Sequence, residues 1–377
     1  MTAKPRRLRI LHLQSSFGPG DNAVRSVQLI NAFGRGCEHS IVSAIPDAMA
    51  AARGIDPGIA VDLAVDFPPL QGRATPGRLQ RLARAMLGYD LVLTYGYDAM
   101  DAAMAHTLFG GHFSLPPLVH HEDEAKSLKP LQNWYRRIGL GRAAALVVPS
   151  RRLETLAMDY WHQPRWRVKR IIPGIRTAAY TVKPRRDALP RVIKRKGELW
   201  LGTFAELTAA HRLTRLVRAF AALPEPWQLV ILGEGPQRDA VRDEALQLDL
   251  GHRVHLPGSV AEPGKVIGLF DLFALSAEVE QPALALVEAM AAGLALVATD
   301  VGETAALLAP ENRPFVVAAS DETAFAATLR TLAEAPALRA SVGAANRALA
   351  RTKYDEAAMV SAYRKVYGAV LGRESFP

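Results

Sequence analysis

Short apolar runs alternate along the chain with longer stretches of helical periodicity. This alternation is typical of parallel sheets built from strand-helix-strand units. We expect one series of strands at residues 9–13, 40–44, 90–95, 118–121 and 145–148. A second series is expected at residues 199–203, 228–232, 254–256, 272–275 and 295–298. The pattern therefore predicts an α/β protein with two doubly wound Rossmann-like domains in tandem.

A segment without apolar periodicity separates the two series of strands. Residues 177–197 are rich in Lys, Arg and Pro, which is typical of a linker. We therefore place the first domain at residues 1–176 and the second at residues 198–354. Residues 355–377 read as a terminal helix that we expect to pack back on the first domain. A chain of 377 residues is also longer than one hydrophobic core usually serves.

The amino-acid composition indicates the cellular location of the protein and the classes of partner that it could bind. A single cysteine, Cys37, excludes a disulfide framework and a cysteine-based metal site, which favours a cytoplasmic location. The net charge of +9 comes from the first half, because residues 1–190 hold 26 Lys and Arg against 15 Asp and Glu. We find no zinc-finger spacing, aromatic RNA-binding motif or basic zipper, so no nucleic-acid partner is expected. Anionic lipid or acidic glycan remains a suitable partner for this surface.

Residues 75–88 carry a basic amphipathic pattern. The sequence TPGRLQRLARAMLG spaces three arginines by three residues and sets them opposite three leucines; these are Arg78, Arg81 and Arg84, and Leu79, Leu82 and Leu87. An ordinary surface helix explains the pattern, and so does a helix that docks on anionic lipid. The second interpretation predicts a peripheral protein at the inner face of the membrane.

Two glycine-bearing loops follow predicted strands. In SSFGPGDNAV, Gly18 and Gly20 allow close approach of a ligand, and the helix that follows favours an anion. A plain strand-helix turn is the alternative explanation of this loop. The spacing lacks the third glycine of a dinucleotide fingerprint. In LVILGEGPQRDAV, Gly233 and Gly235 flank a turn that fits either tight packing or a wall of a ligand site, and packing is the favoured interpretation.

Two adjacent histidines end the strand at residues 118–121. The sequence LVHHEDEA places His120 and His121 there, with three acids after them. Alternation along a strand sends the two side chains to opposite sides, so one of them is expected to face a substrate phosphate or hydroxyl. A metal cluster is the less favoured alternative, because adjacent histidines rarely converge on one ion. We expect no metal.

Two glutamates lie eight residues apart in AEVEQPALALVEAMAAG. In one continuous helix Glu280 and Glu288 would be separated by about 12 Å and about 80° of azimuth, too far to share one small group. Pro282 indicates instead a loop carrying Glu280, followed by a helix over residues 283–292 carrying Glu288. Both carboxylates then reach one cleft, and Glu288 is suited to accept hydrogen bonds from vicinal hydroxyls, as in ribose binding.

The stretch DLFALSAEVEQPALALVEAMAAGLALVATDVGE resembles the donor-site signature of retaining glycosyltransferases of family 4, which have the GT-B fold of two facing Rossmann-like domains. The resemblance implies that Glu288 holds the ribose of a nucleotide sugar and that Glu280 contacts the sugar. It implies that Gly18 and Gly20 approach the diphosphate, with Gly233 on the donor side. It also implies that His120 or His121 is the active-site histidine.

The same resemblance implies a metal-independent hexosyltransferase that needs no cofactor. The expected substrates are a UDP- or GDP-sugar and a cell-envelope glycan or lipid-linked acceptor, as in polysaccharide biosynthesis. The first domain would then be the acceptor side and the second the donor side.

The chain departs from the family after Glu280, where Gln281 and Pro282 replace the usual Gly-Phe, and at two positions expected on the donor diphosphate. The family usually carries an arginine and, about five residues later, a lysine on the donor diphosphate, whereas Glu206 and His211 stand here. Arg212, Arg215 or an imidazolium at His211 are the candidate replacements. A noncatalytic partner subunit or sugar-nucleotide sensor is therefore the alternative function, with a nucleotide-sugar epimerase as a more distant one.

Overall fold

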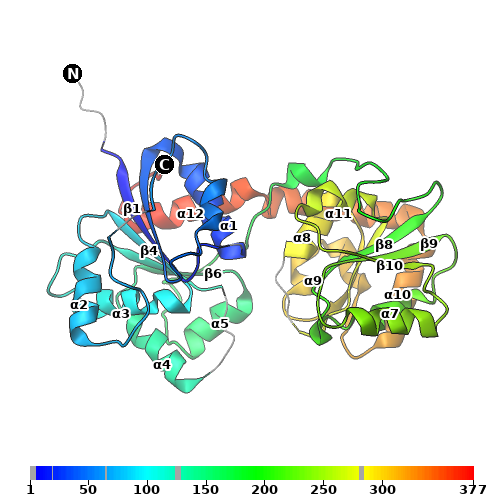
Figure 1. Ribbon diagram of the computed structural model, residues 1–377, viewed down its shortest axis with the longest axis horizontal. Helices are drawn as coiled ribbons and strands as arrows, with labels where there is room; N and C mark the ends of the chain where they lie inside the picture. The colour runs from blue at the N-terminus through cyan, green and yellow to red at the C-terminus, as the bar shows by residue number, and fades with distance from the viewer. Residues whose placement is uncertain (1–5, 19, 64–65, 124–128, 280–283) are drawn as a thin grey trace. The chain divides into compact units, whose positions relative to one another are not determined.

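The computed structural model describes residues 6–18, 20–63, 66–123, 129–279 and 284–377 (Figure 1). The chain divides into two compact units. The first comprises residues 1–172 and 359–377, and the second comprises residues 173–358. The segment expected to be a linker, 177–197, thus belongs to the second unit, where Lys194 donates a hydrogen bond of 2.5 Å to Asp271.

The first unit contains a parallel sheet of seven strands in the order β3-β2-β1-β4-β5-β6-β7. Its strands are β1 (Leu8–Gln14), β2 (Cys37–Ser43), β3 (Ala60–Asp62), β4 (Leu91–Tyr95), β5 (Leu118–His121), β6 (Ala145–Val148) and β7 (Val168–Arg170). The central strands are nearly continuous apolar runs because helices cover both faces of the sheet. In register, Leu11 of β1 lies opposite Ser40 on one side and Val92 on the other.

Helices pack on both faces of this sheet. They are α1 (Asp21–Phe33), α2 (Pro76–Ala85), α3 (Met100–Phe109), α4 (Pro130–Gly139), α5 (Arg151–Asp159) and α12 (Glu356–Val370). Successive residues of β1 point to opposite faces of the sheet. Leu11 packs with α2 and α3, and Ile10 packs with α1 and α12. The last helix of the chain thereby contributes Tyr363 and Tyr367 to the core of the first unit.

The second unit contains a parallel sheet of six strands in the order β10-β9-β8-β11-β12-β13. Its strands are β8 (Leu199–Phe204), β9 (Trp227–Leu232), β10 (Val254–Gly258), β11 (Leu272–Leu275), β12 (Leu296–Asp300) and β13 (Val316–Ala318). Its helices are α6 (Leu213–Phe220), α7 (Arg238–Gln247), α8 (Leu284–Ala292), α9 (Thr304–Leu307), α10 (Glu322–Glu334) and α11 (Pro336–Lys353). Both units are Rossmann-like, which confirms the predicted fold class.

The strand order of the second unit contains a switch point. From β8 the chain adds β9 and β10 on one side, and then returns to place β11 on the other side of β8. In open α/β sheets, ligands bind where the strand order reverses, at the carboxyl ends of the strands. The loops after β8 and β11 are therefore the first place to look for a site.

Candidate functional site

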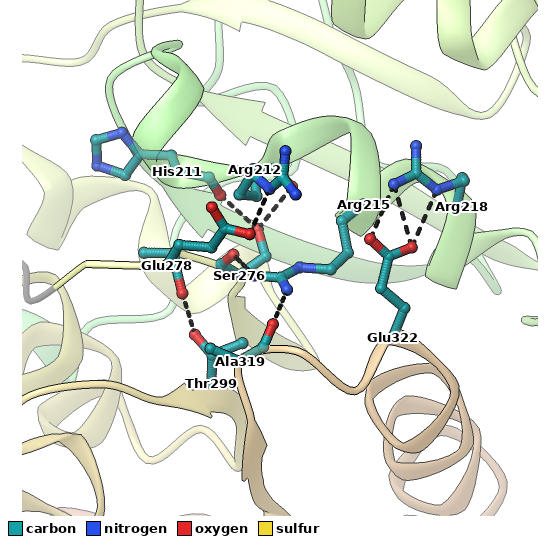
Figure 2. Close-up of polar contacts among 10 residues, drawn as sticks. His211, Arg212, Arg215, Arg218, Ser276, Glu278, Thr299, Ala319 and Glu322 are labelled. Carbon is teal, nitrogen blue, oxygen red and sulfur yellow. Dashed lines mark hydrogen bonds and ion pairs between the residues drawn. The ribbon is translucent and has the colours of Figure 1, made fainter.

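Hydrogen bonds join the loops that follow β8 and β11 at the switch point (Figure 2). The Ser276 hydroxyl donates to the His211 carbonyl at 2.8 Å, and the Glu278 N–H donates to the Ala210 carbonyl at 3.0 Å. The Thr299 hydroxyl donates to the Ala277 carbonyl at 2.6 Å. The backbone of the candidate site is therefore fixed before any ligand enters.

Arg215 of α6 holds this arrangement from inside. Its side chain is buried, and its guanidinium donates hydrogen bonds to the backbone carbonyls of Ser276 and Ala319 (Figure 2). An arginine committed in this way braces the loop and cannot turn toward a ligand without leaving two carbonyls unsatisfied. The structure therefore does not favour Arg215 as a replacement for the missing diphosphate cations.

Arg212 lies at the surface of the same loop. Its backbone is left-handed, with φ of 49°, immediately before the first residue of α6. Its Nε lies 2.7 Å from Glu278 Oε1, and both side chains are nearly half exposed, at 47% and 43%. Arg212 is thus an accessible cation at the switch point, and its counter-ion comes from the loop after β11.

The two residues that depart from the family pattern also lie in the β8 loop. Glu206 is exposed to solvent, and His211 is partly buried with its Nδ1 2.8 Å from the Thr208 hydroxyl. Thr208 thus orients the imidazole of His211 from within its own loop.

Gly233 and Gly235 allow the β9 loop to pack on the β8 loop. A Cβ added to Gly233 would lie 1.9 Å from the Ala205 carbonyl oxygen, and one added to Gly235 would lie 2.6 Å from the Leu207 carbonyl oxygen. The Leu207 N–H donates to the Glu234 carbonyl at 2.9 Å across this contact. Packing alone thus requires both glycines, as the favoured interpretation had it, and contact between Gly233 and a donor stays a prediction.

Glu288 lies on α8, beyond the loop after β11. The Tyr180 hydroxyl donates to Glu288 Oε1 at 2.8 Å, and burial together with the adjacent carboxylate raises the pKa of Tyr180. The phenol therefore remains a donor and orients the carboxylate. The other glutamate of the pair, Glu280, and Pro282 lie outside the described residues.

Part of the second unit matches a known protein family. Residues 186–349 match the family of glycosyl transferases group 1. This segment includes the loops at the switch point and the helix that carries Glu288.

One curated relative matches part of the chain. The lipopolysaccharide core biosynthesis glycosyltransferase LpsD of Rhizobium meliloti (strain 1021) is 25% identical over 152 residues. The match covers 40% of this chain and 44% of that protein, so the chain matches less than half of the relative's length.

Solved structures match nearly the whole chain. HepE of Anabaena, solved in complex with UDP, has a TM-score of 0.77 at 18% identity, covering 96% of this chain and 100% of that one. The lipopolysaccharide outer core galactosyltransferase WaaB, solved in its apo form, has a TM-score of 0.69 at 14% identity, covering 96% and 99%. At these identities the likeness shows the fold, and the two Rossmann-like units are those of GT-B structures.

In the first unit, the two histidines of β5 point to opposite sides, as alternation predicts. His121 is fully buried against α12: its Nε2 lies 2.8 Å from the Tyr367 hydroxyl, and its ring stacks on Tyr95 at 4.4 Å. Burial lowers the pKa of His121 well below its ordinary value, so the ring is neutral. These contacts are those of a core histidine.

His120 has one nitrogen without a hydrogen-bond partner in the described part of the chain. Its Nδ1 lies 2.8 Å from the Thr94 hydroxyl, while its buried Nε2 has no hydrogen-bond partner among the described residues and lies 3.9 Å from Glu122 Oε2. His120 and His121 therefore differ in their contacts, and the predicted active-site role of either histidine stays a prediction.

The first two acids after these histidines, Glu122 and Asp123, form ion pairs with arginines. Glu122 accepts a hydrogen bond of 2.8 Å from Arg136, and Asp123 accepts two, of 2.5 and 2.7 Å, from Arg25 of α1. Within the described part of the chain, no group of three or more His, Cys, Asp or Glu is arranged to hold a metal ion.

The loop after β1 contains the other predicted glycines. Gly18 is buried and its N–H donates to the Ser16 hydroxyl at 3.2 Å, and Gly20 precedes the first residue of α1. Both lie at the carboxyl end of β1, and the proposed contact with a diphosphate stays a prediction.

The predicted basic face of residues 75–88 is wrong at one position. Arg78 is buried, and its guanidinium pairs with Asp101 of α3 at 2.5 Å and donates to the carbonyls of Pro69 and Leu70. Helical spacing cannot show that an arginine turns inward toward an acid 23 residues away. Arg81 and Arg84 remain exposed. No described helix is long and apolar enough to cross a membrane.

Proposed function

We propose that this protein is a retaining glycosyltransferase that transfers a sugar from a nucleotide diphosphate donor to a cell-envelope glycan or lipid-linked acceptor. One observation carries the proposal: the segment that matches the group 1 family holds Glu288 oriented by Tyr180, and an accessible Arg212 at the switch point. These are the groups needed to bind a ribose and a diphosphate.

In this proposal Glu288 accepts hydrogen bonds from the ribose hydroxyls of the donor. A carboxylate has several acceptor positions, and the bond from Tyr180 fixes its plane so that vicinal hydroxyls meet it in one orientation. UDP-sugars are the donors to test first, because HepE has been solved with UDP and with UDP-glucose. GDP-sugars are the second class to test.

Departure of the diphosphate is the step that needs stabilisation. In a retaining reaction without a protein nucleophile, the acceptor hydroxyl oxygen bonds to the anomeric carbon on the face that the diphosphate leaves, and its proton passes to the departing diphosphate. Breaking the bond between that carbon and the diphosphate leaves negative charge on the diphosphate oxygens. Cations placed there in advance lower the barrier. Arg212 is the accessible cation in the β8 loop, with His211 beside it, and His120 of the first unit is the proposed partner of the donor sugar.

The proposed acceptor class rests on the names of two similar proteins. LpsD is named as a lipopolysaccharide core biosynthesis glycosyltransferase and WaaB as a lipopolysaccharide outer core galactosyltransferase, and lipopolysaccharide is a lipid-linked glycan. An acceptor of this kind resides at a membrane surface, so the enzyme would work as a peripheral protein.

Helix α4 is the surface that suits such a membrane contact. Leu131 and Trp134 are 75% and 56% exposed, and Arg137 follows them at the same spacing on the outer face of the helix. Trp166, also exposed, stacks with Arg167, which donates to the Leu140 carbonyl at the end of α4. Exposed tryptophan and leucine beside arginine is the composition of an interfacial helix on anionic lipid.

A noncatalytic sensor or partner subunit is the second candidate. It is favoured by the exposed Glu206, which stands in the β8 loop where the family usually has an arginine. A carboxylate near the diphosphate weakens binding through repulsion. Such a protein would bind a nucleotide sugar and leave it intact.

The test is to incubate the protein with a panel of UDP- and GDP-sugars, with and without cell-envelope extract. Turnover is measured as the release of the nucleoside diphosphate. We expect slow donor hydrolysis that Glu288→Ala abolishes and that the surface control Glu334→Ala leaves unchanged. Binding without any turnover would establish the sensor. Absence of binding to every nucleotide sugar would refute both candidates.

A further inference from the structure

We propose that Glu278 is a built-in competitor of the donor: its carboxylate occupies Arg212 in the free protein and must leave when a diphosphate binds. The inference rests on the proposed function, since it assumes that a nucleoside diphosphate enters at the switch point. It adds a residue that controls how strongly and how selectively that diphosphate is held.

The backbone around Arg212 and Glu278 is held by other contacts, so only the two side chains need to move when a diphosphate replaces the Glu278 carboxylate. The Glu278 N–H is bonded to the Ala210 carbonyl at 3.0 Å, and the Ser276 hydroxyl donates to the carbonyls of His211 and Arg212 at 2.8 and 3.3 Å. Arg215 fixes the Ser276 carbonyl from the buried side. The loops are thus tied together by contacts that do not involve the Arg212 and Glu278 side chains, and these contacts survive when the ion pair opens.

The pair is suited to exchange. Arg212 Nε lies 2.7 Å from Glu278 Oε1, and solvent reaches both side chains. Exposed ion pairs of this kind contribute little free energy, because water competes for both charges. A diphosphate carries more negative charge than a carboxylate and accepts two parallel bonds from a guanidinium. It therefore replaces Glu278 on Arg212.

A second ion pair on the same helix provides the comparison. Arg218 donates to both oxygens of Glu322 at 3.0 to 3.2 Å and also lies 3.3 Å from Glu244 (Figure 2). These contacts raise the pKa of Arg218 and lower that of Glu322. This pair links α6 to α7 and α10, and it is held from two sides. It is a structural pair between helices, whereas the Arg212–Glu278 pair joins two loops at the switch point.

The exchange has a consequence for selectivity. A ligand must supply enough negative charge to release Arg212 from Glu278 and to tolerate the displaced carboxylate nearby. A nucleoside diphosphate meets this requirement better than a monophosphate, and a nucleoside does not engage the pair at all. Glu278 therefore lowers the affinity for the intact donor and its diphosphate product, whose binding requires the exchange, and leaves the affinity for a nucleoside unchanged.

The experiment compares dissociation constants of the full chain for UDP, UMP and uridine by calorimetry, with GDP, GMP and guanosine as the second set. We expect Glu278→Gln to bind the diphosphate about three- to tenfold tighter, and to bind the nucleoside as the unchanged protein does. Arg212→Gln should bind the diphosphate at least about tenfold more weakly. The matched controls Glu322→Gln and Arg218→Gln should stay within about twofold.

The possible failures are distinguishable. If the unchanged protein binds neither UDP nor GDP, the proposed function falls and this inference falls with it. If it binds a diphosphate but Glu278→Gln binds no tighter, the proposed function stands and the competitor role is wrong. Arg212→Lys, which keeps the charge, should retain most of the affinity, and its failure to do so in a folded protein would also count against the exchange.

Discussion

The Tyr180 hydroxyl donates a hydrogen bond of 2.8 Å to the Glu288 carboxylate, and the two residues lie 108 positions apart in the chain. Glu288 belongs to the conspicuous sequence pattern of the site, whereas Tyr180 belongs to a segment that reads as a linker. The orientation of the proposed ribose-binding carboxylate thus depends on a residue outside the sheet and its connecting loops.

Removing this phenol should weaken donor binding. We expect Tyr180→Phe to raise the donor KM by about three- to tenfold with a smaller change in kcat, because the carboxylate loses the bond that orients it. Steady-state kinetics of donor hydrolysis measure the effect. The control is Tyr160→Phe, an exposed tyrosine of the first unit, which should leave KM unchanged. Equal KM values for both variants would exclude a positioning role for Tyr180.

Gly233→Ala should destabilise the second unit. The added methyl would lie 1.9 Å from the Ala205 carbonyl oxygen, so backbone must move, and we expect a loss of about 2 kcal/mol or more in the free energy of unfolding. Urea denaturation measures it. At Gly77, in α2, an added Cβ meets open space, so Gly77→Ala should stabilise by about 0.5–1 kcal/mol. Similar stabilities of the two variants would contradict the packing role.

The two histidines of β5 should respond differently to substitution. His120→Gln, which keeps a polar group beside Thr94, should lower kcat by about tenfold or more while the melting temperature changes little. His121→Gln should lower the free energy of unfolding by about 1–3 kcal/mol, because it disrupts the buried contact with Tyr367. Melting curves and donor turnover of both variants show which histidine acts on the substrate and which stabilises the fold. The opposite pattern would assign the active-site role to His121.

Acid should destabilise the first unit. Burial lowers the pKa of His39 to about 4 and lowers the pKa of His12 well below its ordinary value. The unfolded chain therefore binds more protons than the folded one below about pH 6.5. Stability is complete above that pH and falls as the pH drops toward 4, by up to ~1.4 kcal/mol per pH unit for each histidine.

Urea midpoints measured at intervals from pH 7.5 to 4.5 check this prediction. His39→Gln should reduce the slope, since it removes one of the titrating groups. A slope that is unchanged by the substitution would mean that other groups cause the acid sensitivity.

Binding to lipid should depend on α4 rather than on α2. In a flotation assay with vesicles containing anionic lipid, Trp134→Ser and Leu131→Ser should each reduce the bound fraction about threefold or more. Arg81→Ser, on the exposed side of α2, is the comparison and should have a smaller effect. Binding that is independent of anionic lipid, or more sensitive to Arg81 than to Trp134, would overturn the assignment. Concentration-dependent self-association lost in Trp134→Ser would identify a second copy as the occupant instead.

The sequence predicted the strands of both sheets well where they are central. Strands that are buried on both faces have continuous apolar sequences. For this reason β5, β6 and β11 were predicted at their observed bounds. The edge strands β3, β7 and β13 were missed. Each has three residues and is partly exposed, which leaves too short a pattern to detect.

The site was predictable only in its parts with local signatures. Glu288 and the glycine loops stand in recognisable patterns, whereas the partners that orient them come from distant segments. Glu278 lies next to the recognised motif, but its role depends on Arg212, which precedes it by 66 positions. Arg78 and Arg215 show the converse: their charge suggests a ligand or a membrane, and their contacts are internal carbonyls and an acid.

The position of α12 at residues 356–370 determines when the first unit can complete its hydrophobic core during synthesis. The core of the first unit includes Tyr363 and Tyr367, which a ribosome synthesises only after the whole second unit. In a nascent first unit, the face of β1, β4 and β5 that α1 and α12 share is therefore only partly covered while residues 173–358 emerge and fold. Its apolar sheet is then the surface most in need of a chaperone, and a stop codon shortly before residue 359 would damage the domain farthest away in the sequence.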